Sequence, residues 1–324
     1  MSPSPPTAGK TPRRIVEPPT ASTTGLPRAK GFDAEITQLQ AFLDTWRSAA
    51  NEEMRAMLAW QFLGRSKYFR PATVFACCQA MSPGPISADV IQRAAAVEMM
   101  HNVSLIVDDI LDRSRYRRGV QTLHCRFGQL PALMASGYIS AEAFRLCRDY
   151  PFGIDRLAEL LERLAAAESI QWRLRRQPLG VEDWRFLAGE DTGTMFEACA
   201  CLGTGDEQLR QYGRQLGMLY HGCDDVGDVR GAVALGGGGD EDLRDGIVTL
   251  PVAIAIRDPA VALLFRDPTP ADLQALVVKV GEALPEAERY LDSLADEAIA
   301  EARRVAPNPG PLIDLVRNTR PLSH

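Results

Sequence analysis

The sequence predicts an all-α fold, and three observations support that prediction. Long segments recur in which apolar side chains return every three or four positions, as on one face of a helix. No stretch alternates convincingly between apolar and polar residues, as a half-buried strand would. Clusters of glycine and proline stand between the helical segments, at residues 83–85, 236–239 and 307–311. We therefore expect one all-α domain over residues 32–324.

Residues 1–31 differ from the rest of the chain. They are rich in proline, serine and threonine and show neither a helical nor a strand period, which is typical of a disordered tail. Glu17 is the only acidic residue there beside five basic ones, so a transit peptide is the alternative. The prolines oppose the continuous amphipathic helix that such a peptide needs.

The expected helices follow one another from residue 32 onward. The first segment, 32–63, places Ile36, Leu39 and Leu43 at helical spacing. The second begins with a Ser-x-Asp cap signal at Ser87 and runs without a breaker to Asp112. Further helical segments are expected at residues 152–176, 206–228 and 285–305.

The composition narrows the classes of function. The formal net charge of -6 argues against a general nucleic-acid binder, because phosphate binding favours a basic surface. No apolar run approaches the roughly 20 residues that cross a bilayer, so we expect a soluble protein. The seven cysteines lack paired Cys-x-x-Cys spacing, and we expect them to be reduced in the cytoplasm.

A cluster of acidic residues ends the second predicted helix. Asp108 and Asp112 are four residues apart and share one helix face, while Asp109 lies about 100° round the helix. The apolar segment before them predicts burial, where unpaired carboxylates would repel one another and resist desolvation. Arginines follow at positions 113, 115, 117 and 118.

The same pattern recurs at the end of the 206–228 segment, as Asp224, Asp225 and Asp228. A single D-D-x-x-D cluster is often a solvated helix end, but two clusters that each close an apolar helix favour a common site. Hard oxygen ligands in two facing groups suit Mg²⁺, which bridges a few carboxylates to substrate phosphates. Arginines beside the first cluster would then donate to phosphate. The sequence therefore predicts a magnesium-dependent site for a phosphorylated ligand.

Together with the run Arg117-Arg118-Gly119, the two clusters make residues 35–255 resemble the trans-isoprenyl diphosphate synthases, also called polyprenyl synthetases. The resemblance implies an isoprenoid-synthase-type helical bundle around a central cavity, and a homodimer. It implies three Mg²⁺ ions held by the six aspartates of the two clusters. In that family an allylic prenyl diphosphate ionises, isopentenyl diphosphate attacks the cation, and the released diphosphate takes the final proton.

The family's motifs carry over to named positions. In "SKYFRP", Lys67 and Arg70 would bind the diphosphate of isopentenyl diphosphate, together with His101 and Arg118. Arg117 matches the arginine on the allylic diphosphate and would share the catalytic role of the aspartates. Other matching positions are expected to line the cavity or contact substrate; these are Glu168, Gln171, Thr192 and His221.

The sequence departs from the family on the allylic side. Asp191, Gly237 and Ile247 stand where the family has lysines, and His221 stands where a glutamine precedes the second cluster. Charge-assisted contacts are worth about 1.5–3 kcal/mol each. The grip on the leaving diphosphate is therefore weakened unless arginines replace the lysines in space, and the candidates are Arg173, Arg230 and Arg244.

Three functions stay open on this basis. The first is a prenyltransferase that condenses an allylic diphosphate with isopentenyl diphosphate, which the retained acceptor-side residues favour. The second is a terpene synthase of the same fold that ionises one prenyl diphosphate, which the lost lysines favour. The third is a non-catalytic partner subunit of an active homologue, which the two intact aspartate clusters oppose.

The helix before the first cluster bears on chain length. In the family, side chains on that helix set the floor of the cavity into which the product grows. Ser104 and Val103 lie one turn before Asp108 and are small, so Met99 or Met100, a turn deeper, would form the floor. A turn adds about 5.4 Å of depth. We therefore expect a product or substrate as long as geranylgeranyl diphosphate or longer.

Overall fold

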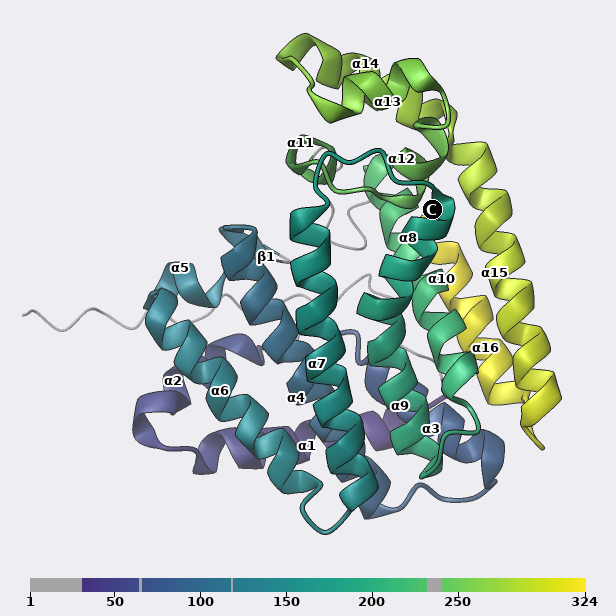
Figure 1. Ribbon diagram of the computed structural model, residues 1–324. Coiled ribbons are helices and arrows are strands. Elements are labelled where there is room, and N and C mark those ends of the chain that lie inside the picture. The colour runs from purple at the N-terminus through teal and green to yellow at the C-terminus, as the bar shows by residue number, and fades with distance from the viewer. Residues whose placement is uncertain (1–30, 64–65, 118, 232–240) are drawn as a thin grey trace, which may run out of the picture.

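The computed structural model describes residues 31–63, 66–117, 119–231 and 241–324, and its fold is helical, as predicted (Figure 1). The predicted disordered tail, Arg118 and Gly237 lie outside the described residues, apart from residue 31 of the tail.

The helices follow one another in chain order. The first half contains α1 (Asp33–Ala49), α2 (Glu52–Gln61), α3 (Phe69–Met81), α4 (Ala88–Leu111), α5 (Leu123–Phe127), α6 (Gln129–Leu146) and α7 (Pro151–Arg173). Next come α8 (Val181–Ala188), the π-helical turn η1 (Gly189–Gly193), α9 (Thr194–Thr204), α10 (Arg210–Val229), α11 (Glu241–Asp245) and α12 (Leu250–Ala255). The last are α13 (Pro259–Arg266), α14 (Pro270–Glu282), α15 (Leu284–Val305), α16 (Gly310–Thr319) and the 3-10 helix η2 (Arg320–Ser323).

Local sequence signals fix several helix ends. The side chain of Ser87 accepts a hydrogen bond from the backbone N–H of Val90, which is the predicted cap at the start of α4. The first predicted segment divides into α1 and α2, because the side chain of Asn51 caps a new helix by accepting from the backbone N–H of Glu53.

The long helices pack side by side around the site. Helix α4 packs against α3, α6 and α9, while α10 packs against α9 and α15. Helices α4, α7 and α10 run in the same direction in Figure 1, so their C-terminal ends, which carry or adjoin the acidic residues, reach the same end of the molecule. Helix α11 lies beyond that end, next to the group formed by α12, α13 and α14.

Two apolar cores support this arrangement. The larger one includes Phe75, Trp184 and Phe196, all nearly inaccessible to solvent. The smaller one joins α12, α13 and α14 through residues such as Phe265 and Leu276. Burying such a side chain contributes about 1.5–3 kcal/mol, so the end of the molecule above the acidic residues has its own apolar support.

The seven cysteines are free thiols, as expected. Five of them are buried; they are Cys77, Cys147, Cys199, Cys201 and Cys223. Among the described residues, the helices are too short or too polar to cross a membrane.

The expectation that the chain contains no strand is wrong at one place. Strands β1 (Tyr116–Arg117) and β2 (Val120–Gln121) form a short antiparallel pair directly after the first aspartate cluster. Gly119 has φ +73°, a left-handed conformation that glycine adopts without strain in a tight turn. Two residues per strand are too few for an alternating pattern to be seen in the sequence.

Candidate active site

The structure brings both aspartate clusters to one cavity of about 530 Å³. Asp108 and Asp112 line it from the end of α4, and the second cluster lines it from α10. Glu168 and Gln171 of α7 line the same cavity, as the resemblance implies. The remaining acidic lining residues are Asp191 of the π turn and Asp242 of α11.

Burial and mutual repulsion disfavour the charged form of these carboxylates. Burial raises the pKa of Asp108 well above its usual range, and the charges of Glu168 and Asp191 raise it further. Burial, and then neighbouring carboxylates, raises the pKa of Glu168 and of Asp242 to about 7 each, and that of Asp224 to about 6. The C-terminal end of a helix also disfavours negative charge. A polyvalent cation would relieve this repulsion.

The donor set fits Mg²⁺ without forming a complete cage. Carboxylate oxygens from two helices converge on the cavity, and no cysteine lines it. Within the described parts of the chain, no three His, Cys, Asp or Glu side chains are close enough to hold a metal ion by themselves. Mg²⁺ commonly keeps several waters and binds one or two carboxylates together with substrate phosphates. The residues that could hold it are Asp108, Asp112, Asp224 and Asp228.

The second aspartate of each cluster has a different environment. Asp109 is 3% exposed, does not line this cavity, and accepts a 2.7 Å hydrogen bond from Nε of Arg117. Asp225 is 7% exposed, and its Oδ2 accepts from Nε1 of Trp184 and from the backbone N–H of Leu250, each at 2.8 Å. These contacts engage one oxygen of each aspartate, and Asp225 also lines the cavity, so the metal-ligand role expected from the sequence stays a prediction for both.

A second, smaller cavity of about 80 Å³ adjoins the first at Arg117, which lines both. His101 lines it, and Nη1 of Arg70 lies 3.1 Å from Nε2 of His101. The Arg70 guanidinium also lies 5.5 Å from the centroid of the Phe196 ring. Lys67 is buried, and its charge lowers the pKa of Asp224, as does that of Arg70, so both cations are close to the second cluster.

Asp191 and His221, two residues at which this chain differs from the family, lie next to each other. Asp191 and Thr192 stand on the π turn, and His221 stands on α10. Nδ1 of His221 lies 2.9 Å from Oγ1 of Thr192 and 3.6 Å from Oδ2 of Asp191, while its Nε2 lies 3.7 Å from Oδ1 of Asp225. Burial would lower the pKa of His221, but these carboxylates and others raise it. A histidine whose charged form these carboxylates favour therefore stands beside the aspartate that replaces the lysine.

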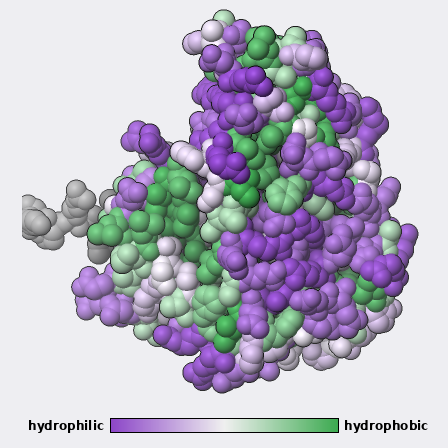
Figure 2. Space-filling model, viewed as in Figure 1, coloured by the Kyte–Doolittle hydropathy of each residue, from purple (hydrophilic) through white to green (hydrophobic). Residues whose placement is uncertain are grey.

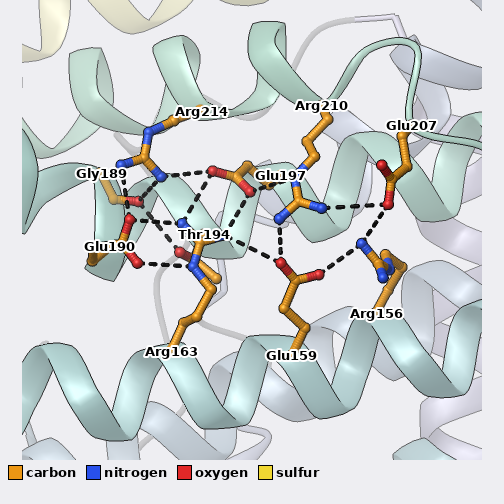
Figure 3. Close-up of polar contacts among 10 residues, drawn as sticks. All are labelled: Arg156, Glu159, Arg163, Gly189, Glu190, Thr194, Glu197, Glu207, Arg210 and Arg214. Atoms are coloured by element: carbon orange, nitrogen blue, oxygen red, sulfur yellow. Dashed lines mark hydrogen bonds and ion pairs between the residues drawn. The ribbon is translucent and has the colours of Figure 1, made fainter.

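The π turn is also held from its outer side (Figure 3). Arg214 of α10 donates to the carbonyl of Gly189 at 3.1 Å and to Glu190 at 2.9 Å. Arg163 of α7 donates to Glu190 and Glu197, and the network continues to Arg210, Glu159, Arg156 and Glu207. Figure 3 shows these side chains meeting between three helices, and they tie the turn that carries Asp191 to α7 and α10.

The arginines proposed to replace the lysines do not line the cavity. Arg230 instead donates to Ser323 and pairs with Glu288. Arg173 is exposed. The sequence reasoning missed Arg175, which does line the cavity. Arg175 lies in the turn beyond the end of α7 at Arg173, so helical spacing from Glu168 and Gln171 does not fix its position.

The predicted floor residues lie away from the described cavities. Ser104 donates a 2.9 Å hydrogen bond to the carbonyl of His101, and Val103, Met99 and Met100 are buried in the core. None of the four lines either cavity. The chain-length expectation therefore stays a prediction.

Comparison with known proteins extends these findings. Residues 51–268 match the polyprenyl synthetase family. A nonaprenyl diphosphate synthase of Mycobacterium tuberculosis is 29% identical over 241 residues, which cover 71% of this chain and 72% of the relative. Geranylgeranyl pyrophosphate synthase 4 of Arabidopsis thaliana is 28% identical over 222 residues, which cover 61% of this chain and 59% of the relative.

Solved structures show the same fold. A decaprenyl diphosphate synthase from Rhodobacter capsulatus superposes with a TM-score of 0.80 at 22% identity, over 91% of this chain and 98% of the other. A polyprenyl synthase from Caulobacter crescentus, complexed with calcium and isoprenyl diphosphate, superposes with a TM-score of 0.79 at 24% identity, over 90% and 94%. The family match spans most of the chain and includes both aspartate clusters, so the chain belongs to the polyprenyl synthetase family.

Proposed function

We propose that the protein is a Mg²⁺-dependent prenyltransferase of isoprenoid biosynthesis that condenses an allylic prenyl diphosphate with isopentenyl diphosphate. Family membership supports prenyltransferase activity. The observation that carries the proposal is the pair of adjoining cavities that share Arg117, one lined by both aspartate clusters and one beside Arg70 and His101. An enzyme that uses one substrate has no need of a second set of basic residues such as Lys67, Arg70 and His101.

The larger cavity suits the allylic diphosphate. Asp108, Asp112, Asp224 and Asp228 would hold Mg²⁺, which when bound supplies positive charge to the departing diphosphate. Arg117, fixed by Asp109, adds a guanidinium at the border of the two cavities. Apolar lining residues would exclude water from the prenyl cation; they are Leu111, Leu174, Leu179, Leu187, Ile247 and Val248.

The smaller cavity suits isopentenyl diphosphate. His101, which lines it, would bind its diphosphate together with Lys67 and Arg70, which lie outside its described lining. We assign Arg118 to the same group from the sequence motif alone. Lys67 and Arg70 lower the pKa of Asp224, so these two cations lie close to a carboxylate that lines the larger cavity. This proximity supports reaction between two bound substrates. The product proposed from Ser104 and Val103 has the length of geranylgeranyl diphosphate or more.

We also propose a homodimer in the cytoplasm. Figure 2 shows a hydrophobic area over α5 and α6, where Leu130 and Met134 are 67% and 54% exposed. They lie four residues apart, on one side of α6. The free cysteines suit a reducing compartment. Light scattering tests the assembly: the wild type should have twice the mass of the chain, and Leu130→Asp should shift it towards the monomer.

Product analysis tests the function against its alternatives. The protein is incubated with Mg²⁺ and geranyl or farnesyl diphosphate, with and without isopentenyl diphosphate. Prenyl diphosphates longer than the supplied one, formed only with isopentenyl diphosphate, are the expected result. A hydrocarbon or alcohol made from the allylic substrate alone identifies a terpene synthase, the alternative that Asp191 favours. Absence of turnover under all conditions supports a non-catalytic partner subunit.

A further inference from the structure

The cavity that holds both aspartate clusters contains few fixed cations for a diphosphate. Its described lining has two arginines, Arg117 and Arg175. Arg117 is already engaged by Asp109. Of the family's lysine positions, Asp191 carries a negative charge and Ile247 none. Besides the Mg²⁺ proposed above, a diphosphate in this cavity therefore has Arg175 and His221 as the remaining basic side chains of the described lining.

We propose that Arg175 binds the allylic diphosphate in place of the lysines missing at positions 191, 237 and 247. The assignment rests on the proposed function, because it presumes that the larger cavity takes a prenyl diphosphate.

The side chain of Arg175 is placed between Asp112 of the first cluster and Asp245 of α11. Its Nη2 lies 3.4 Å from Oδ1 of Asp112, and its Nη1 lies 3.9 Å from Oδ2 of Asp245, the last residue of α11. Both separations exceed the 2.7–2.9 Å of a strong charge-assisted hydrogen bond. The guanidinium can therefore exchange these partners for phosphate oxygens at little cost.

The guanidinium has donor capacity to spare. Its Nε is buried and has no hydrogen-bond partner among the residues that the structure describes. A buried N–H without a partner is unfavourable, so a ligand oxygen that reached it would gain a full hydrogen bond. The guanidinium carbon lies 4.1 Å from the centroid of the Trp172 ring. Packing over the ring restricts the movement of the guanidinium. Its N–H groups can then form two parallel hydrogen bonds to one phosphate.

The backbone holds Arg175 at this place independently of its ion pairs. The next residue, Arg176, adopts a left-handed φ of +64°, and its backbone N–H donates to the carbonyl of Gly246 at 2.8 Å. The Arg176 side chain donates to the carbonyl of Arg244. The turn after α7 is thereby tied to the segment that follows α11, which lines the cavity at Gly246, Ile247 and Val248.

Inorganic diphosphate in the presence of Mg²⁺ is the probe that tests this assignment, with affinity measured by isothermal titration calorimetry. Arg175→Gln should weaken binding about 10–100-fold, and Arg175→Lys should retain part of the affinity. Arg173→Gln is the matched control, because it removes an exposed arginine two residues away and should leave binding unchanged. In turnover assays, Arg175→Gln should raise KM for the allylic substrate and leave KM for isopentenyl diphosphate unchanged.

A rescue variant separates binding from a structural role. Adding Asp191→Lys to Arg175→Gln restores a cation at the family's position and should recover affinity for diphosphate. Thermal unfolding of each variant shows whether it is folded; if Arg175→Gln is not, the comparison of Arg175→Lys with wild type decides. Unchanged diphosphate binding in Arg175→Gln, or equal loss in Arg173→Gln, would overturn the role of Arg175 alone. A wild-type protein that fails to bind diphosphate with Mg²⁺ would overturn the proposed function as well.

Discussion

Adjacent aspartates within a cluster have different surroundings. Asp224 faces the cavity, where burial and the charge of Asp225 raise its pKa to about 6. Asp225 accepts hydrogen bonds from the indole of Trp184 and from the backbone of Leu250. Both carboxylates line the cavity, and Asp225 in addition completes hydrogen bonds that hold the fold together.

Alanine at Asp224 should affect mainly turnover, whereas alanine at Asp225 should also lower the free energy of unfolding. Asp224→Ala should lower turnover by orders of magnitude while the free energy of unfolding stays unchanged or rises, because a repelled carboxylate is removed. Asp225→Ala should lower the free energy of unfolding by about 1–3 kcal/mol for each donor left without a partner. Turnover assays and denaturant unfolding measure the two effects. Near-normal turnover of Asp224→Ala would contradict its role as a metal ligand.

The sequence predicts some of these residues and not others, for a physical reason. The four-residue spacing of Asp108 and Asp112 suffices to place both on one helix face, because helix geometry is local. The contact between Asp191 and His221 joins residues thirty positions apart. Such a pair depends on how two helices pack, which the spacing of residues along one helix does not specify. The sequence shows both as unusual, but only the structure shows that they are partners.

At the scale of elements, helix α10 contacts the π turn through three residues on one of its faces. Arg214, Gly217 and His221 follow one another at intervals of three and four residues and so share one face. Arg214 donates to the carbonyl of Gly189, and His221 lies against Thr192. A Cβ added to Gly217 would lie 2.7 Å from Cα of Gly193, so the two backbones are in close contact between these ends.

Removing the contacts of Arg214 with the π turn should affect substrate binding. Arg214→Met should raise KM for the allylic diphosphate several-fold, because the π turn that positions Asp191 and Thr192 loses a support. Arg156→Met removes a different arginine of the same network, one that contacts Glu159 and Glu207 but not the turn. Steady-state kinetics of both variants measure the effect. Equal changes in KM would show that the network serves stability and not the site.

The same network predicts a pH dependence of stability. Burial alone would raise the pKa of Glu197, but hydrogen bonds and charges from Arg163, Arg214 and Arg210 lower it below its usual range. A carboxyl with a lowered folded-state pKa stabilises the fold above its unfolded pKa of about 4.3. That contribution is lost as pH falls through the folded pKa. Glu197→Gln should thus be less stable than wild type at pH 7, and the difference should vanish in acid. A difference in unfolding free energy that does not depend on pH would exclude this cause.

The length of the prenyl product is predicted from side chains on helix α4. Ser104→Phe places a ring one turn before Asp108, where the wild type has a small side chain. If the growing chain passes this level, the variant should make shorter products than wild type, as measured by chromatography of the dephosphorylated prenols. An unchanged product distribution would mean that the floor of the cavity is formed elsewhere.

At the scale of the whole molecule, the fold class and the order of the long helices follow from the sequence. Their apolar periodicity is regular, and signals such as the Ser87 cap are local. The π turn and the β1–β2 pair could not be predicted in the same way. Each element is at most five residues long, too short for a periodic pattern. The π turn is also stabilised by contacts from another helix, such as those of Arg214 with Gly189 and Glu190.

At this scale, we propose that one chain holds two adjoining diphosphate sites, of which only the larger depends on metal. Equilibrium binding of isopentenyl diphosphate to the chelated protein tests this most directly. We predict that it binds without Mg²⁺, through cationic side chains, and that Lys67→Ala weakens this binding. A non-hydrolysable allylic diphosphate analogue should bind only when Mg²⁺ is restored. If isopentenyl diphosphate does not bind the chelated protein, or if both ligands bind equally well without metal, the account of two distinct sites is wrong.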